Sequence, residues 1–190
     1  MLSIAQMLTP TVHDLSREPD TVHRLNVNSF QQSALTSFRS YQYCAFYRAH
    51  SASVRHVVLG RRKVAVGVPW ELLEFDDYDQ VMDDGHNTIS IGICHGDGTI
   101  HLSFDHHSDD LKYRVSDKGC ASDPEKFEWK ASLFSPVLNR LDRYPQSTKL
   151  PVLQLVTYPR FISFGEGLLF ECRIGRQVGN IYSHSQPTID

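Results

Sequence analysis

Two histidines, His86 and His107, are the residues of this sequence whose type and spacing best suit proton transfer. A histidine can hold or donate a proton near neutral pH, and these two flank a stretch of alternating apolar and polar residues. His106 adjoins His107, so either residue could be the partner of His86, and spacing and face favour His107. By residue type alone, two histidines on the polar face of a hairpin are more often solvated or hydrogen-bonded to the backbone than catalytic.

A β-hairpin is the element predicted to position the two histidines. Apolar residues alternate with small polar residues over 88–94 and over 100–104, which is the period of two expected for half-buried strands. If the turn is Gly96-Asp97, the apolar side chains pair across the hairpin and His86 lies opposite His107. If the turn lies one residue later, the pairing slips by two residues but both histidines stay on the same face.

The polar face of this hairpin also offers metal-ligand types. It carries imidazole, carboxylate and thiol groups from His86, His101, His107, Asp105 and Cys94, all of which ligate zinc. Strand alternation spreads these groups along a strip, whereas a tetrahedral centre needs them at one point. The sequence therefore predicts no metal and no cofactor. The aspartates between residues 76 and 84 lack the ligand spacing of a calcium loop and indicate a solvated acidic turn.

Composition excludes several classes of function. The 190 residues are 41% hydrophobic and 22% charged with a formal net charge of −3, which indicates one globular unit without affinity for nucleic acid or an anionic membrane. The four cysteines have no CxxC spacing, so neither a zinc knuckle nor a dense disulfide framework is expected. No signal peptide is visible in residues 1–30, and no stretch approaches the ~20 apolar residues that cross a bilayer.

Short strands are predicted through most of the remaining chain, and no stretch has helical periodicity. The segment 55–68 indicates two strand pieces broken at Gly60-Arg61-Arg62. The other predicted strands are Ser40–Arg48, Trp70–Phe75, Leu111–Ser116, Phe127–Phe134, Val152–Phe164 and, after a turn at 165–167, Leu168–Ile174, followed by a polar tail.

Successive four-stranded meanders of about 40 to 50 residues are typical of propeller blades. The fold prediction is therefore all-β, a partial β-propeller of about two and a half four-stranded antiparallel blades. Its divisions are a leader at 1–32 and a propeller domain at 33–190, with blades near 40–80, 86–135 and 150–190. Closed propellers need about four to eight blades, so we expect a truncated form whose exposed edges favour self-association. A two-sheet β-sandwich is the alternative.

Several short motifs resemble those of the BNR-repeat-containing proteins. The first group of motifs consists of Gly85-His86-Asn87, Gly92-Ile93, Asp97-Gly98-x-Ile100-His101-x-Ser103, Asp105-x-His107 and Leu111-x-Tyr113-Arg114. The second group, Tyr158-Pro159-Arg160-Phe161 followed by Leu168-Leu169-Phe170-x-x-Arg173, resembles the next blade of the same family. That family includes seven-bladed propeller polysaccharide lyases acting on ulvan and on rhamnose-glucuronate linkages.

The resemblance implies a lyase-type β-elimination beside a uronic acid, in a secreted protein. Its paired histidines match His86 and His107, its catalytic tyrosine matches Tyr158, and the arginine facing the carboxylate matches Arg173. The expected substrate contacts are Asn87, Arg160 and His106. Such a reaction needs a group that neutralises the carboxylate, a base for the C5 proton and an acid for the departing O4. Whether histidine or tyrosine is the base stays open.

A second hairpin is predicted to bring the tyrosine and the arginine together. With Gly165-Glu166 as its turn, Tyr158 falls opposite Arg173. If both hairpins are inner strands of neighbouring blades, the four side chains converge at one mouth of the central channel.

The alternative function is a non-catalytic carbohydrate-binding or interaction fragment. Aromatic residues on the predicted strands would then serve as sugar platforms or as core. They are Tyr41, Tyr43, Phe46, Trp70 and Tyr113.

Overall fold

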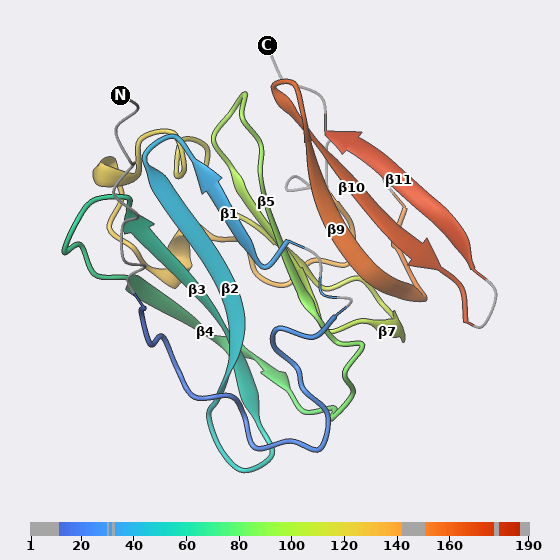
Figure 1. Ribbon diagram of the computed structural model, residues 1–190. Helices are drawn as coiled ribbons and strands as arrows, with labels where there is room; N and C mark the ends of the chain where they lie inside the picture. Colours follow the sequence, from blue (N-terminus) through green and yellow to red (C-terminus); the bar gives the residue numbers. More distant parts are fainter. Residues whose placement is uncertain (1–11, 30, 32, 142–150, 177–178, 187–190) are drawn as a thin grey trace, which may run out of the picture.

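The computed structural model describes residues 12–29, 31, 33–141, 151–176 and 179–186. They form three antiparallel sheets joined by loops and two short 3-10 helices (Figure 1), which confirms the all-β prediction. Residues 1–11 of the predicted leader lie outside the described residues. Within the described ranges, no helix is long and apolar enough to span a bilayer.

The first sheet contains β1 (Leu35–Phe38), β2 (Tyr41–Ala49), β3 (Arg55–Lys63) and β4 (Glu71–Gln80), in that order. The predicted break at 60–62 is wrong, because β3 runs through Gly60, which pairs with Cys44 and Leu72. A Cβ at Gly60 would lie 2.9 Å from the Cys44 sulfur, so this glycine allows close packing against neighbouring side chains and does not end the strand.

The second sheet contains β5 (Ile89–Ile93), β6 (Ile100–Phe104) and β8 (Tyr113–Val115). The predicted hairpin register is confirmed, with Ile93 opposite Ile100 and Ile89 opposite Phe104. The predicted strand at 127–134 is wrong. The 3-10 helix η1 (Pro124–Lys126) precedes this segment and the 3-10 helix η2 (Ala131–Leu133) lies within it, and an isolated bridge joins Phe134 to Ser116. This sheet therefore has three strands instead of the four expected.

The third sheet contains β7 (His107–Asp109), β9 (Val156–Phe164), β10 (Gly167–Ile174) and β11 (Asn180–Gln186), in the order β11-β10-β9-β7. Two features were not predicted. The segment expected to be a polar tail contains β11, and β7 leaves the second sheet to pair with β9. Asp105, with φ of 61°, turns the chain between β6 and β7, so one continuous segment contributes strands to two sheets.

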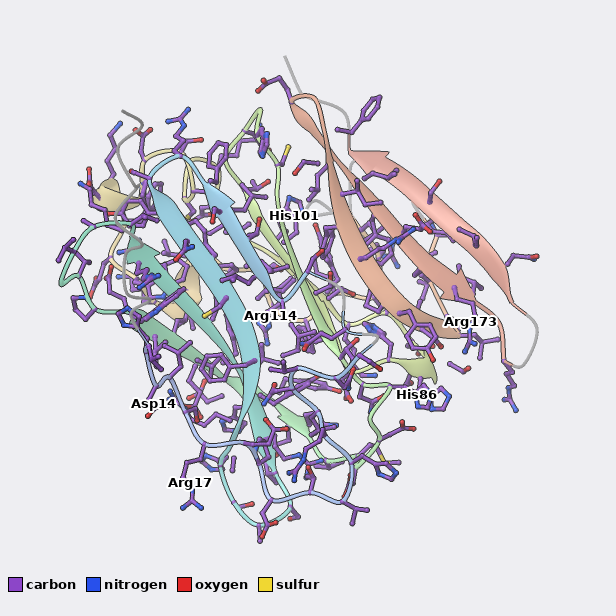
Figure 2. All side chains as sticks on the ribbon, viewed as in Figure 1. Asp14, Arg17, His86, His101, Arg114 and Arg173 are labelled. Atoms are coloured by element: carbon purple, nitrogen blue, oxygen red, sulfur yellow. The ribbon has the colours of Figure 1, made fainter. Side chains whose placement is uncertain are left out.

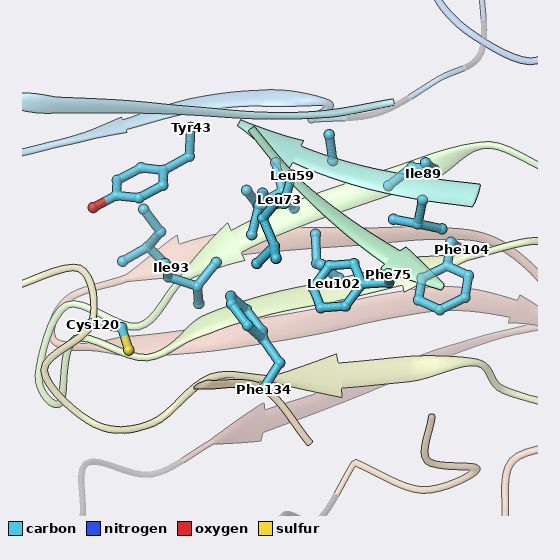
Figure 3. Packing of buried hydrophobic residues seen from close by; sticks show 14 of the residues in the cluster. Tyr43, Leu59, Leu73, Phe75, Ile89, Ile93, Leu102, Phe104, Cys120 and Phe134 are labelled. Atoms are coloured by element: carbon cyan, nitrogen blue, oxygen red, sulfur yellow. The ribbon is translucent and has the colours of Figure 1, made fainter. Parts of the chain in front are cut away.

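Both faces of the β5-β6 hairpin are buried, and the expectation of a half-buried hairpin is therefore wrong. On one face, the core seen in Figure 3 joins Ile89 and Leu102 to Leu59 and Phe75 of the first sheet. On the other face, β5 packs against β9 of the third sheet. The small polar side chains of this second face are buried because a neighbouring sheet covers them, as in a stack of layers.

The described part of the leader packs onto the first sheet. Leu25 is fully buried in the core that this sheet shares with the second. The Asn26 side chain accepts a hydrogen bond from the Tyr47 backbone N–H and donates one to the Tyr47 carbonyl. Residues of this segment thus cover part of the β2 edge, and the domain boundary at residue 33 stays a prediction.

The four cysteines are buried and free, which gives a first testable expectation. Burial raises the pKa of Cys44 to about 11 and that of Cys172 to about 12, so these thiols are protonated and unreactive at neutral pH. We expect Ellman's reagent to modify none of the four rapidly in the native protein and all four in denaturant. Rapid modification of any thiol without denaturant would contradict this burial.

Candidate active site

Asp84 holds His86 and His107 together. The Nδ1 atoms of the two histidines lie 2.6 Å from the two carboxylate oxygens of Asp84, one histidine on each oxygen. The imidazole rings stack with centroids 4.0 Å apart, and their side chains are 39% and 42% exposed. Both Nδ1 positions therefore face the same carboxylate.

The contact between His86 and His107 was predicted, but the predicted cause is wrong. The β5-β6 ladder ends at Phe104, and His107 begins β7, where its backbone partner is Thr157. The two histidines therefore do not face each other across a hairpin. They meet because Asp84 binds both, and because the turn at Asp105 redirects the chain.

Tyr158 and Arg173 extend this group from the third sheet. The predicted pairing of these two residues is wrong: the register shifts between Glu171 and Arg173, so that Arg173 lies opposite Thr157. Tyr158 occupies the irregular position with φ of 55°. The Arg173 Cζ nevertheless lies 5.3 Å from the centroid of the Tyr158 ring, which is 5.9 Å from the ring of His86. Figure 2 shows Arg173 and His86 in the same region of the molecule, near β7.

The Arg173 guanidinium is held at one side. Its Nη2 donates to the Thr157 hydroxyl at 3.2 Å, and that buried hydroxyl also accepts the Ser108 backbone N–H. Its Nε is buried without a hydrogen-bond partner among the described residues. By contrast Arg160, on the same hairpin, forms an ion pair with Glu171 at 2.7 Å.

Backbone strain accompanies the site. Asp105, Ser108 and Tyr158 have φ of 61°, 58° and 55°, in the left-handed region that non-glycine residues rarely adopt. Such conformations cost about 1–3 kcal/mol each and persist where the surrounding structure imposes them, often at functional sites. Here they set the positions of β7 and of the tyrosine.

Three other residues were expected at the site. They are His106 and Asn87, which are buried, and Arg160, which is partly exposed. His106 is fully buried, and its Nε2 accepts the backbone N–H of Lys112. Burial and then Lys112 hold the pKa of His106 well below its usual value, so this residue is neutral, and it is His107 that lies beside His86. Asn87 is also buried, whereas Arg160 is partly exposed in its ion pair.

Asp84 is the site residue that the sequence did not reveal. It was grouped with a solvated acidic turn, yet its carboxylate also accepts the His86 backbone N–H at 2.9 Å. Partial burial alone would raise its pKa, but this N–H and the two imidazoles hold the pKa of Asp84 well below its usual range. An aspartate two residues before a histidine is an Asx-turn signal that could have indicated this contact.

The same three side chains have the composition of a metal site. One ligand atom from each of Asp84, His86 and His107 lies within 4.8 Å of the others. The wider strip considered from the sequence does not converge, because His101 is buried against Thr99 and Tyr113. Asp105 is likewise engaged, by Gln80 and Tyr78.

Comparisons with known proteins agree with this geometry at the level of family and fold. The model of a BNR repeat-containing family member matches residues 41–186. The chain belongs to the BNR repeat-containing family. A solved structure titled as the crystal structure of polysaccharide lyase Uly1 is similar, with a TM-score of 0.65 and 20% identity over 83% of this chain.

The chain covers 39% of that lyase structure, so it spans well under half of its length. At this identity the likeness shows the fold, which is a partial propeller-like β fold of three antiparallel sheets. No curated protein matches the chain. The BNR assignment covers β2 to β11, and therefore includes every residue of the candidate site.

Removing the carboxylate that joins the histidines should change stability in a pH-dependent way. Asp84→Asn is expected to lower the free energy of unfolding by about 1–2 kcal/mol at pH 7, the lower part of the range for charged hydrogen bonds, because Asp84 is partly solvated. The folded pKa is lowered, so this stabilisation is present above the unfolded value of about 3.9 and is lost as pH falls below it.

Urea unfolding at pH 7 and at pH 3 measures this linkage. The difference between the wild-type chain and Asp84→Asn should be smaller at pH 3. An equal difference at both pH values would show that the carboxylate charge is not what stabilises the histidine pair.

Proposed function

We propose that this chain is a polysaccharide lyase-like protein that cleaves a uronic-acid-containing glycan of the rhamnose-glucuronate type by β-elimination. The observation that carries the proposal is the row Arg173, Tyr158, His86 and His107, in which each side chain lies next to the following one. The reaction needs a cation for the carboxylate and proton-transfer groups beside it, and this row supplies both.

Arg173 is assigned to the uronate carboxylate. A guanidinium binds a carboxylate through two parallel hydrogen bonds, and neutralising the carboxylate makes the C5 proton more acidic. Arg173 suits this role better than Arg160, because Glu171 already pairs with Arg160. Thr157 fixes one edge of the Arg173 guanidinium through Nη2 and so limits its orientation.

The histidine pair is assigned to proton transfer. Asp84 accepts from both Nδ1 positions, and its lowered pKa keeps it ionised. An imidazole acts as a base through an unprotonated ring nitrogen and as an acid through a ring N–H, so two adjacent histidines can supply both roles.

Tyr158 is the second candidate for the acid of the reaction. Its ring lies between Arg173 and His86, so its hydroxyl is the further candidate for protonating O4. Comparing Tyr158→Phe with His86→Ala and His107→Ala tests the division of roles: the variant of the essential base loses elimination altogether, and that of an auxiliary acid loses part of it.

Product formation tests the proposal directly. The purified chain is incubated with ulvan and with rhamnose-glucuronate-capped glycans, and the ultraviolet absorbance of the unsaturated uronate product is followed. Product that disappears in His86→Ala supports the proposal. Absence of product with every uronate glycan, from a chain shown to be folded by circular dichroism, would contradict it.

We also propose that the three sheets are consecutive blades, about two and a half, of a partial β-propeller. Their antiparallel strand orders and stacked packing support this interpretation. In the described part of the chain, β4 and β11 are outer strands of their sheets; outer strands favour self-association, which light scattering over a range of concentrations would detect.

A second candidate function, carbohydrate binding without cleavage, is favoured by a separate pocket. Three of the five aromatic residues considered for this role, Tyr41, Tyr43 and Tyr113, are buried core. Phe46 and Trp70, however, line a pocket of about 640 Å³ on the first sheet.

Trp70→Ala distinguishes this second function from the first. If the pocket binds the glycan, the substitution should weaken binding about tenfold in calorimetry, in line with about 1–2 kcal/mol for an aromatic contact. A chain that binds glycan without forming product, and whose binding is unaffected by Arg173→Ala, would favour the binding module over the lyase.

A further inference from the structure

A second cluster of metal-ligand side chains lies on the first sheet, away from the candidate active site. Ligand atoms of His50, His56 and Glu74 lie within 4.8 Å of one another. His50 and His56 stack with ring centroids 4.3 Å apart, and the His56 Nδ1 is 2.8 Å from a Glu74 oxygen. None of these residues takes part in the proposed elimination.

The strand register explains why these residues share one face. Arg48 pairs with His56, and Val58 pairs with Glu74, so Arg48, His56 and Glu74 lie on the face opposite to the core residues Val57 and Phe75. His50 directly follows β2 and is exposed. Its ring stacks on the buried ring of His56, beside the half-buried Glu74.

An irregularity in β4 adds a fourth group. The register between β3 and β4 shifts from Val57–Phe75 to Arg55–Gln80, so residues 76–79 of β4 oppose a single residue of β3, His56. This bulge brings a carboxylate oxygen of Asp79 to 3.1 Å from the His56 Nε2. His56 is 3% exposed and has a carboxylate at each ring nitrogen.

This arrangement contains side chains that could ligate a metal directly and a carboxylate that could orient one of these ligands. A histidine that ligates a metal through one nitrogen commonly donates its other N–H to a carboxylate, and Asp79 occupies that position for His56. Two imidazoles with one carboxylate form a known zinc ligand set that leaves a fourth position open. Arg48 pairs with the other Glu74 oxygen at 3.2 Å, so Oε1, which faces His56 Nδ1, is the oxygen placed to bind a cation.

We propose that His50, His56 and Glu74 bind a divalent transition-metal ion of the zinc type, with Asp79 orienting His56. The ion takes the place of the hydrogen bond between His56 Nδ1 and Glu74 Oε1, and the ring then keeps its proton on Nε2, which faces Asp79. Imidazole ligands favour zinc over calcium or magnesium. The bound ion ties the end of β2 to β3 and β4.

Metal titration tests this site in a chain that lacks the other cluster. The His86→Ala/His107→Ala double variant removes the imidazoles around Asp84, and chelator-treated protein is titrated with ZnCl2 by calorimetry and with Co²⁺ by visible absorption. We expect one zinc ion per chain, a tetrahedral-type Co²⁺ spectrum and a higher melting temperature with zinc.

Substitutions in the same background locate the ion. His50→Ala, at an exposed position, and Glu74→Gln should each weaken zinc binding more than tenfold, and Asp79→Asn about tenfold as an outer-layer carboxylate. His23→Ala, which removes an exposed histidine paired with Asp83, should leave binding unchanged. Absence of zinc binding in the double variant, or binding that His50→Ala and Glu74→Gln both leave intact, would overturn the proposal.

Discussion

Gly92→Ala is expected to lower the free energy of unfolding by about 3 kcal/mol, the upper end of what overpacking costs. A Cβ at position 92 would lie 2.3 Å from the Cβ of Phe161 and 3.1 Å from a methyl of Leu168. The nearer atom is next to the β9 backbone, so the whole strand must move. Phe161 is itself buried and packs 5.3 Å from Phe170, which leaves little room for that movement. Urea unfolding measures the loss.

Gly85→Ala is the matched control for Gly92→Ala. A Cβ at Gly85 meets its nearest atom at 3.4 Å, so that variant should change stability by less than about 1 kcal/mol. Combining Gly92→Ala with Phe161→Gly, which removes the Cβ that clashes, should restore room, and the two effects should therefore sum to less than their separate costs. If Gly92→Ala were as stable as Gly85→Ala, the close packing of β5 on β9 would be wrong.

The sequence predicted the β5-β6 hairpin because its information is local. A strict apolar alternation and a Gly-Asp-Gly turn determine which residues pair, and the observed pairing of Ile91 with Leu102 is the predicted one. The sequence did not predict that the polar face is buried. That burial depends on Phe161 of β9, whose position follows from long-range packing and not from any local pattern.

The aromatic segment after residue 124 was predicted to be a strand, and it does not form one. Phe127, Trp129 and Phe134 have the composition of a strand, yet they pack against the core from the irregular segments next to two 3-10 helices. The Trp129 ring lies 5.9 Å from Phe134 and 4.6 Å from the Arg61 guanidinium. The apolar character of these aromatic residues correctly indicates that they are at least partly buried. It does not show that they form a strand, because β-propensity scales measure burial as much as backbone preference.

Residue type and family resemblance identified the residues of the candidate site. The sequence did not predict what brings these residues together, because it suggested regular strand pairing. The predicted ladder pairs, His86 with His107 and Tyr158 with Arg173, do not occur. An irregular backbone at Tyr158 and a carboxylate at Asp84 bring the same side chains together. Period-two patterns assume regular strands, so they cannot locate residues at a bulge or between sheets.

Arg173→Ala is expected to reduce kcat/KM for a uronate glycan about 100- to 1,000-fold, the effect of losing one preorganised group that stabilises developing charge. The structural reason is that the Arg173 guanidinium lies against Tyr158, with its Cζ 5.3 Å from the centroid of that ring. Arg173→Lys should recover little activity, because an ammonium group cannot replace the planar two-point contact with a carboxylate. Initial rates of unsaturated product formation measure both variants.

Arg160→Ala is the comparison that separates carboxylate binding from a general effect of positive charge. Arg160 lies on the same hairpin and is neutralised by Glu171 at 2.7 Å, so its loss should change kcat/KM by less than about tenfold, chiefly through KM. Melting curves of both variants should stay close to that of the wild type, since neither guanidinium is part of the apolar core. An Arg173→Ala chain that kept its activity, or an Arg160→Ala chain that lost as much, would remove Arg173 from the proposed chemistry and leave the carboxylate without its assigned partner.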